Sequence, residues 1–289
     1  LADGPQRTIT SGTLDQFLPE GRSVTDVLAS TSANHIAYQE HRRMPEELFT
    51  PELIEFWWGV MPGHTAYPWI FPNDDSVARI GLTMPIGLDI DDYDRSEWAL
   101  LREDDDGIPR GSEYLERLLE MQFPNYDLDD FPLVEDRGKS GGTETYPISS
   151  TRPIDSPTGA NVAVVGGAMG ATSAFHEGGD HVAVRSGSIA GELAAADEMD
   201  RYNAAWHDAI GEEIQRNVAM ADYVHDYGPA DWDHAFATVD RMLSTDGPLW
   251  RQAFAGGLDG LKFFYGYKRE KFRLRNHRYV QLSEDEYMV

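Results

Sequence analysis

The first half of the chain alternates short apolar runs with turn residues, a pattern typical of β-strands. Four runs rich in β-branched and aromatic residues lie at 35–43, 53–60, 65–71 and 77–84. The last three are separated only by short breaks that contain proline, glycine, asparagine and aspartate. Connections this short cannot hold crossover helices, so the pattern predicts an antiparallel meander.

The second half changes to helical spacing. A short apolar strand is predicted at 161–165, followed by a tight turn at 166–170 and an alanine-rich helix from Gly178 to about Glu198. More helices are expected to about Tyr267, and one in the first half at 112–122. The sequence therefore predicts an α/β (α+β) protein with an antiparallel sheet and a helical carboxy-terminal region.

Acidic residues dominate the charge of the chain. Its 289 residues include 50 acidic and 24 basic ones, for a net charge of -26, and only four of the basic residues are lysines. Such self-repulsion destabilises a compact state, and salt at 1 M screens it within about 3 Å. We therefore expect a haloarchaeal-type protein, with an ordinary acidic protein as the alternative, and we exclude duplex nucleic acid as a partner.

Several classes of site are excluded or disfavoured by composition. Because the chain has no cysteine, it holds no disulfide, thiolate nucleophile or cysteine-bound metal cluster within these residues. It has no apolar run of about 18 residues that could span a bilayer. Asp127, Asp129 and Asp130 fit a solvated surface better than a cation site, so we predict no metal. The start at Leu1, without a methionine or a secretory signal, suggests that the beginning of the protein is missing.

The glycine-rich turn suits a phosphate group. Glycines at 166–170 let backbone N–H groups approach an anion, and Gly178-Gly179 would open a helix whose dipole favours negative charge. The turn is not GxGxxG, so a plain packing turn remains the alternative.

The segment 164–187 resembles the second flavin-binding motif of FAD enzymes with the p-hydroxybenzoate-hydroxylase architecture. The resemblance implies FAD as cofactor and a helix that faces it from Gly178 and Gly179. It places the ribityl-phosphate region beside Gly166, Gly167, Ala168 and Gly170. The family's aspartate, which bonds the ribityl hydroxyls, is Gly167 here, so binding is expected to be weaker or rearranged around Glu177 or Asp180.

The first residues carry a second resemblance. Ala2-Asp3-Gly4, followed by Arg7, is similar to the Ala-Asp-Gly motif of the same enzymes. This implies that Asp3 and Gly4 lie near the flavin and that a Rossmann GxGxxG precedes Leu1.

The run Tyr67-Pro68-Trp69-Ile70-Phe71-Pro72, with Gly81 nine residues later, resembles the Tyr-x-Trp-x-Phe-Pro…Gly-x-Gly motif of geranylgeranyl reductases; Thr83 replaces the last glycine. On a strand, Tyr67, Trp69 and Phe71 share one face. The resemblance implies an isoprenoid slot lined by this aromatic wall, with Pro72 and Gly81; an ordinary core stripe is the alternative.

Together these resemblances imply an FAD-dependent oxidoreductase, similar to digeranylgeranylglycerophospholipid reductase, that reduces C=C bonds of geranylgeranyl chains in archaeal membrane lipids. They imply reduced nicotinamide or ferredoxin as electron donor, and His176 and His181 are the candidate proton donors. Four segments are expected. They are the end of an FAD-binding domain at 1–30, a substrate-binding sheet at 31–150, an FAD-binding strand-turn-helix at 151–200 and a helical region at 201–289.

The basic, aromatic segment 262–278 predicts peripheral contact with the inner face of the cell membrane, in a cytoplasmic protein. Docking onto the chain's own acidic body is the alternative. Two other functions stay open. Gly179 to Ala183 with Ser186-Gly187 resembles electron-transfer-flavoprotein dehydrogenases, although their cysteine-bound cluster is missing here. The chain could also be a non-catalytic lipid-binding or partner subunit with a decayed flavin site.

Overall fold

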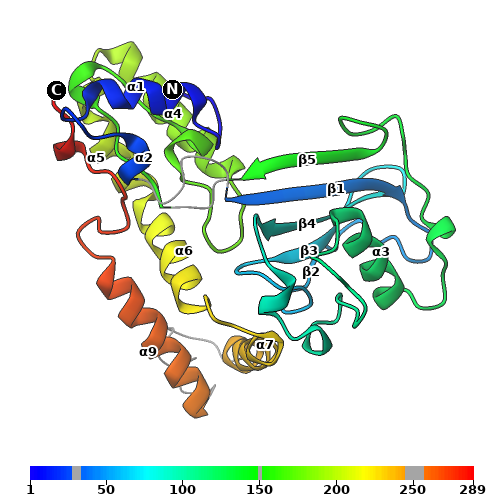
Figure 1. Ribbon diagram of the computed structural model, residues 1–289. Coiled ribbons are helices and arrows are strands. Elements are labelled where there is room, and N and C mark those ends of the chain that lie inside the picture. Colours follow the sequence, from blue (N-terminus) through cyan, green and yellow to red (C-terminus); the bar gives the residue numbers. More distant parts are fainter. Residues whose placement is uncertain (28–33, 149–151, 245–256) are drawn as a thin grey trace. The chain divides into compact units, whose positions relative to one another are not determined.

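The computed structural model describes residues 1–27, 34–148, 152–244 and 257–289 (Figure 1). The chain divides into two compact units. The first unit contains Leu1–His35, Pro147–His225 and Gly247–Val289, and the second contains Ile36–Tyr146 and Asp226–Asp246. The four functional segments expected from the sequence stay a prediction, because compactness does not assign function.

A five-stranded sheet forms in the order β2-β3-β4-β1-β5. Its strands are β1 (His35–Arg43), β2 (Glu55–Phe56), β3 (Tyr67–Pro72), β4 (Val77–Pro85) and β5 (Thr143–Ile148). The pairs β2–β3 and β3–β4 are antiparallel, which confirms the predicted meander.

The prediction of a strand over 53–60 was wrong in extent, since only two of its residues form β2. Leu53 closes a turn by donating its N–H to the Thr50 carbonyl at an N···O distance of 3.2 Å. At the other end Gly59 has a φ of 79°, which turns the chain out of the extended conformation. These two turns limit the strand.

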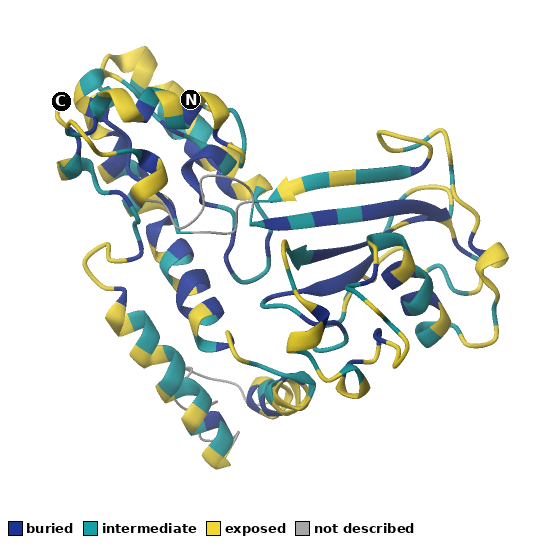
Figure 2. Ribbon diagram, viewed as in Figure 1, coloured by how far each residue is buried: buried dark blue, intermediate teal, exposed yellow. Residues whose placement is uncertain are grey.

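Alternation along β3 and β4 gives the sheet two different faces. Ile70 pairs with Ile80, and their side chains belong to a core that includes Leu82 and, from α3 (Gly111–Gln122), Tyr114 and Leu115. Trp69 pairs with Gly81, and these two residues belong to the opposite face, because successive residues of a strand point to opposite sides. In Figure 2 most of β3 and β4 is drawn as buried.

Helices dominate the first unit, as predicted for the carboxy-terminal half. They are α1 (Thr8–Leu14), α2 (Val24–Val27), α4 (Asp180–Ala196), α5 (Tyr202–Trp206), α6 (Glu212–Tyr223) and α9 (Gly257–Arg273). A π-helical segment, His207–Gly211, joins α5 to α6. Leu14, Met169, Val182 and Trp206 pack together in the core of this unit. In the second unit, α7 (Pro229–Leu243) starts with proline at its first position.

Two local predictions around the glycine turn were wrong. Residues 162–165 are extended but form no strand; their described backbone pairing is with Leu1, whose carbonyl accepts from Val165 N–H at 2.9 Å. The helix begins at Asp180 rather than at Gly178, because the Gly178 N–H donates to His176 Nδ1 at 3.3 Å and Gly179 is not helical.

Gly81 is required by close packing. A Cβ there would lie 2.5 Å from the Trp69 ring and 2.7 Å from Gln39 Cβ. We expect Gly81→Ala to lower the free energy of unfolding by about 1–3 kcal/mol, as overpacked cores do. Denaturant unfolding in molar KCl measures this. Gly107→Ala is the matched control, since nothing lies within 4 Å of its Cβ position; equal stability losses in both variants would contradict the packing argument.

Candidate functional site

The structure brings together the two segments predicted to border a flavin. A Cβ at Gly167 would lie 3.4 Å from Pro5 Cδ and 3.7 Å from the carbonyl carbon of Gly4. The Ala2–Gly4 motif and the turn Gly166–Met169 are therefore neighbours although the sequence separates them widely. The contact is made by backbone atoms and the proline ring. Gly4 and Gly167 therefore present only backbone atoms at this point.

Arg7 ties these two segments to each other. Its side chain is fully buried, and its Nε donates to the Ala168 carbonyl at 2.7 Å. Its own N–H donates to the Gly4 carbonyl at 3.2 Å, with a backbone φ of 51°. Burial lowers the pKa of Arg7 to about 10, while the nearby charge of Asp3 raises it. Arg7 is thus a buried cation at neutral pH, with its Nε bonded to the Ala168 carbonyl and the negative charge of Asp3 nearby.

The carboxylate of Asp3 is directed at the start of α1. It accepts hydrogen bonds from the N–H groups of Ile9 at 2.6 Å and Thr10 at 3.0 Å, and from the Thr10 hydroxyl. Burial alone would raise the pKa of Asp3, but these hydrogen bonds outweigh it and leave the pKa lowered. Asp3 therefore acts as the cap of α1, and Gly4 is the residue of this motif that faces Gly167.

The turn itself is fixed from behind by α4. Gly166 and Gly170 have φ of 61° and 73°, which favour glycine. The Gly166 N–H donates to Ser186 Oγ at 3.0 Å, and a Cβ on Gly166 would lie 3.2 Å from Ala183 Cβ. The amide of Gly166 is therefore used inside the protein. Ala168 and Gly170 are buried as well, and the Gly170 N–H donates to the Gly167 carbonyl at 3.1 Å. Gly167, which is partly exposed, is therefore the position of these three that is most open to a ligand.

The site residues predicted near the start of α4, which are Gly178, His176 and His181, differ in their burial and in their neighbours. Gly178 gives space to His176, since a Cβ would lie 2.9 Å from Nδ1 of that imidazole. Burial, followed by the charge of His181, lowers the pKa of His176, which favours the neutral ring. The partly exposed His181 has its Nε2 2.5 Å from Glu213 Oε1.

The two carboxylates considered as replacements for the family's aspartate differ in burial. Glu177 has a φ of 58°, is buried, and lies 3.2 Å from Nε2 of the buried His35. Asp180 is exposed at the first turn of α4. Asp180 is therefore the one that solvent and a ligand could reach.

In the second unit, the predicted aromatic wall is part of a larger aromatic cluster. The ring centroids of Tyr67 and Trp69 are 5.9 Å apart, and those of Trp69 and Phe71 are 5.3 Å apart. The cluster extends through β2 and its following turn to two rings of α7, with Trp58 6.1 Å from Trp232. Its members are Phe56, Trp58, Tyr67, Trp69, Phe71, Trp232 and Phe236.

Glycines allow the cluster to close. Besides Gly81 under Trp69, Gly59 lies against Trp232, where a Cβ would be 2.9 Å from the Cβ of that residue. The sequence analysis did not predict that α7 contributes to the cluster. Trp232 and Phe236, two aromatic residues four positions apart on one side of a helix, could have indicated it. Phe56 and Phe236 stay 42% and 47% exposed, so the cluster is apolar surface as well as core.

A polar patch borders this cluster on the same face of the sheet. Gln39 lies beside Gly81, since its Cβ would contact a Cβ placed there. The Gln39 amide donates a hydrogen bond to Glu144, and His41 Nε2 lies 3.5 Å from the same carboxylate. Burial raises the pKa of Glu144, but hydrogen bonds from Gln39, Tyr146 and His41 leave it lowered. Within the described residues, the buried Trp69 Nε1 has no hydrogen-bond partner. The alternate positions of Gln39 and His41 on β1 could have signalled this patch.

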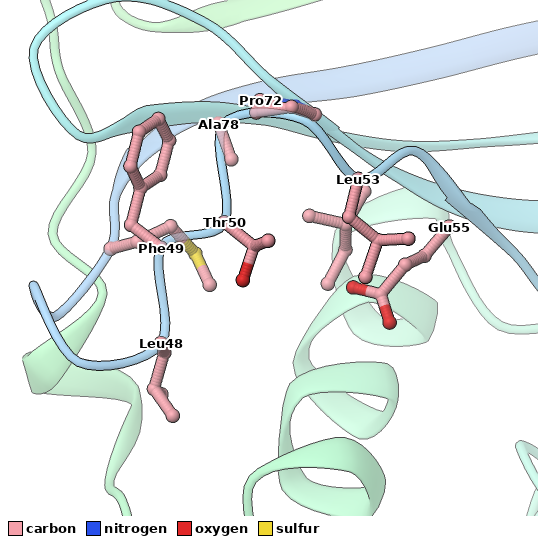
Figure 3. Close-up of a pocket in the computed structure, with 9 residues that line it drawn as sticks. Leu48, Phe49, Thr50, Leu53, Glu55, Pro72 and Ala78 are labelled. Carbon is pink, nitrogen blue, oxygen red and sulfur yellow. The ribbon is translucent and has the colours of Figure 1, made fainter.

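A small cavity of about 20 Å³ lies on the other side of the sheet (Figure 3). Its lining includes Phe49, Leu53, Ile70 and Pro72, so Pro72 contacts this cavity. The volume suits a water molecule and is too small for an isoprenoid chain.

Comparison with known proteins finds relatives that include two reductases of known name. No protein-family model matches the chain. It is 26% identical over 206 residues to digeranylgeranylglycerophospholipid reductase 2 of Methanothermobacter thermautotrophicus, which covers 66% of this chain and 44% of that protein. It is 31% identical over 158 residues to digeranylgeranylglycerophospholipid reductase of Methanocaldococcus jannaschii, covering 54% and 33%. The chain thus spans less than half the length of these relatives.

The fold also matches a solved structure. A geranylgeranyl bacteriochlorophyll reductase-like protein of Thermoplasma acidophilum has a TM-score of 0.54 at 17% identity, over 83% of this chain and 57% of that one. The chain is therefore a mixed α/β protein related in sequence to digeranylgeranylglycerophospholipid reductases. No helix within the described residues is long and apolar enough to cross a membrane.

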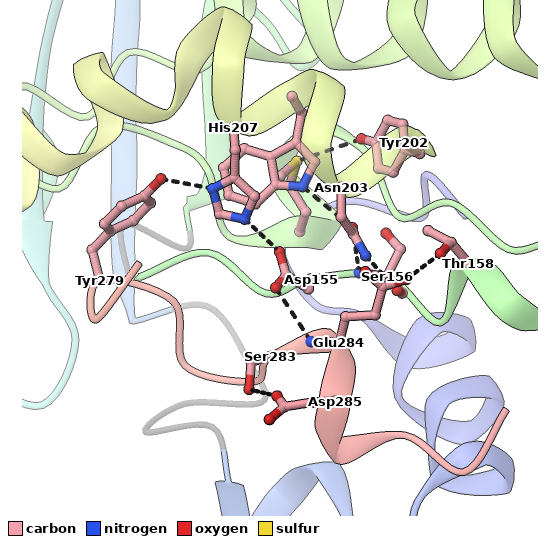
Figure 4. Close-up of polar contacts among 12 residues, drawn as sticks. Asp155, Ser156, Thr158, Tyr202, Asn203, His207, Tyr279, Ser283, Glu284 and Asp285 are labelled. Atoms are coloured by element: carbon pink, nitrogen blue, oxygen red, sulfur yellow. Dashed lines mark hydrogen bonds and ion pairs between the residues drawn. The ribbon is translucent and has the colours of Figure 1, made fainter. Parts of the chain in front are cut away.

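A second polar network, in the first unit, was not predicted. His207 bonds Asp155 Oδ1 through Nε2 at 2.9 Å and the Tyr279 hydroxyl through Nδ1 at 2.8 Å (Figure 4). Asp155 also accepts from the Glu284 N–H at 3.2 Å, and its carbonyl accepts from the Tyr287 hydroxyl at 2.9 Å. These bonds attach the carboxy-terminal segment to the core. Gly211 makes room for them, because a Cβ there would lie 2.6 Å from the Tyr279 oxygen.

The capping role of Asp3 has a pH signature. A lowered folded-state pKa means that the carboxylate contributes stability above the unfolded pKa of 3.8 and loses it as pH falls through the folded value. Asp3→Asn keeps an acceptor oxygen but removes the charge, so we expect it to lower the free energy of unfolding at pH 7 by about 0.3–1 kcal/mol, as the loss of a favourable charge at a helix amino terminus does. The difference from wild type should shrink below the unfolded pKa. Asp200→Asn, at an exposed carboxylate, is the control, and a constant difference down to low pH would refute the role.

Proposed function

We propose that this chain is part of an FAD-dependent reductase of C=C bonds in the geranylgeranyl chains of archaeal membrane lipids. The observation that carries the proposal is the contact between Gly4 and Gly167, which places two flavin-like motifs side by side. The names and folds of the relatives support the same class of reaction.

The flavin would be held by the glycine surfaces of the first unit. Gly4, Gly167, Ala168 and Gly170 would lie against its ribityl chain and phosphates, with α4 behind the turn. Gly4 and Gly167 are partly exposed and carry no side chain, so they leave room for a ligand, while Arg7 fixes the turn from the buried side at Ala168. When bound and reduced, the flavin supplies a hydride.

The isoprenoid chain would lie along the aromatic cluster. Tyr67, Trp69 and Phe71 form its wall, and the exposed Phe236 of α7 extends it. Because the Trp69 ring and Gln39 of the polar patch both lie against Gly81, the oxygen-bearing end of the lipid would meet hydrogen-bonding groups near this point. Gly81 would act by making room for the Trp69 ring.

The electron donor and the proton source complete the proposal. Reduced nicotinamide or ferredoxin would reduce the flavin in the cytoplasm. Of the two candidate histidines, His181 is the more accessible, and burial lowers the pKa of His176. Because His181 is more accessible, it is the better candidate proton donor.

The reaction is tested by incubating the intact protein with FAD, a reductant and a geranylgeranyl lipid, and measuring product mass. We expect a gain of two hydrogens for each reduced double bond. No gain, under conditions where flavin is bound and reduced, would reject the reductase activity.

In the same assay, Phe236→Ala should raise KM by roughly five- to thirtyfold, since loss of about 1–2 kcal/mol of apolar contact is expected. Leu243→Ala is the matched control, because Leu243 is 69% exposed on the same helix and lies outside the cluster. An unchanged KM in the Phe236 variant would mean that α7 does not line the isoprenoid slot.

Gly167→Asp tests the flavin site directly. The position has an ordinary backbone φ, and a Cβ would make only van der Waals contact with Pro5. Restoring the family's aspartate should tighten FAD binding roughly ten- to hundredfold, the equivalent of a charged-group hydrogen bond of about 1.5–3 kcal/mol. Flavin fluorescence titration measures it, with Gly167→Ala as control. Equal affinities for the two variants would contradict the placement of the ribityl chain.

A further inference from the structure

Helix α9 has an inner face that is packed against α6. Gly266 allows this contact, because a Cβ would lie 2.2 Å from the Tyr223 ring, and Phe263 meets the same ring edge-on at 5.3 Å. Lys271 Nζ lies 2.8 Å from Glu212 Oε1. Part of the basic segment thus does dock on an acidic residue of the chain itself, and this contact fixes which side of α9 faces outward.

The outer face carries an exposed stripe of alternating apolar and basic side chains. The apolar members Leu258, Tyr265 and Phe272 are 78%, 71% and 60% exposed. Lys262 and Arg269, between them, are 80% and 66% exposed. Steps of four and three residues align these five positions along one side of a helix. In Figure 2 the helix is drawn almost wholly as intermediate or exposed.

The charge of this face is opposite to that of the molecule. Residues 257–278 contain seven basic and two acidic residues, whereas the whole chain has a net charge of -26. The ion pairs of the two stripe cations are long. Lys262 lies 4.0 Å from Asp259, and Arg269 lies 3.6 Å from Glu270, whose carboxylate pairs more closely with Arg273 at 2.7 Å. Arg275 also stacks over the Phe272 ring at 3.4 Å, which places another cation beside the stripe.

We propose that the outer stripe of α9 is a docking surface for an anionic lipid bilayer. Lys262 and Arg269 contact lipid phosphates, and Leu258, Tyr265 and Phe272 enter the boundary between head groups and acyl chains. The rest of the acidic molecule is repelled by the same surface, so the charge pattern selects one orientation. The contact does not depend on the proposed reaction, and a failure of either leaves the other standing.

The experiment is flotation of the full protein with vesicles of phosphatidylglycerol and phosphatidylcholine in equal amounts, and with phosphatidylcholine alone. We expect binding to the anionic vesicles, with at least a tenfold weaker partition for Lys262→Glu/Arg269→Glu, given about 1 kcal/mol per basic residue near the surface. Raising KCl screens the electrostatic part of the binding. Tyr265→Ser/Phe272→Ser should weaken the apolar part, which remains at high KCl. Arg102→Glu/Arg201→Glu, with the same charge change at exposed sites elsewhere, should bind like wild type.

Four results would overturn the proposal. The first three are absence of wild-type binding to anionic vesicles, equal binding to neutral vesicles, and equal weakening by the control pair. The fourth is a wild-type dimer in analytical ultracentrifugation that is lost in Lys262→Glu/Arg269→Glu, which would assign the stripe to a second copy of the chain. Circular dichroism verifies that each variant is folded.

Discussion

The buried guanidinium of Arg7 is the interaction on which the candidate flavin site depends. A charge removed from water costs several kcal/mol unless its partners replace the lost hydration. Here the Ala168 carbonyl accepts from Nε, and Asp3 supplies the opposing charge. Satisfying this cation forces the first residues of the chain against the glycine turn, and Gly4 comes to lie beside Gly167 as a consequence. One polar requirement thereby assembles two segments that are distant in sequence.

Several glycines, two of them in the predicted motifs, serve packing in this fold. Gly81 gives space to the Trp69 ring, Gly178 to the His176 imidazole and Gly211 to the Tyr279 hydroxyl. By contrast, a Cβ at Gly167 would meet only ordinary contacts. A glycine in a cofactor-like motif thus does not by itself mark the cofactor. At Gly81, Gly178 and Gly211 a side chain could not fit, so packing explains the glycine. At Gly167 a side chain would fit, so its absence there is the better indication of a ligand.

Local periodicity was enough to predict β1, the β3–β4 hairpin and α3, because each depends on alternation or helical spacing within one run. It failed at 53–60, where turns at Thr50 and Gly59 end the strand, and at 161–165, where a strand needs partners. The aromatic wall was readable from Tyr67, Trp69 and Phe71. Its extension by α7, the polar patch and the bonds of His207 were not, because they depend on contacts between distant segments.

The central claim is that the glycine surfaces around Gly4 and Gly167 hold a flavin. The most direct measurement is the visible absorption spectrum of the intact protein, purified in molar KCl and then titrated with FAD. The account predicts flavin bands that remain with the protein through gel filtration, or that appear on titration and saturate at one FAD per chain. A colourless protein whose spectrum shows no shift of added FAD would contradict it.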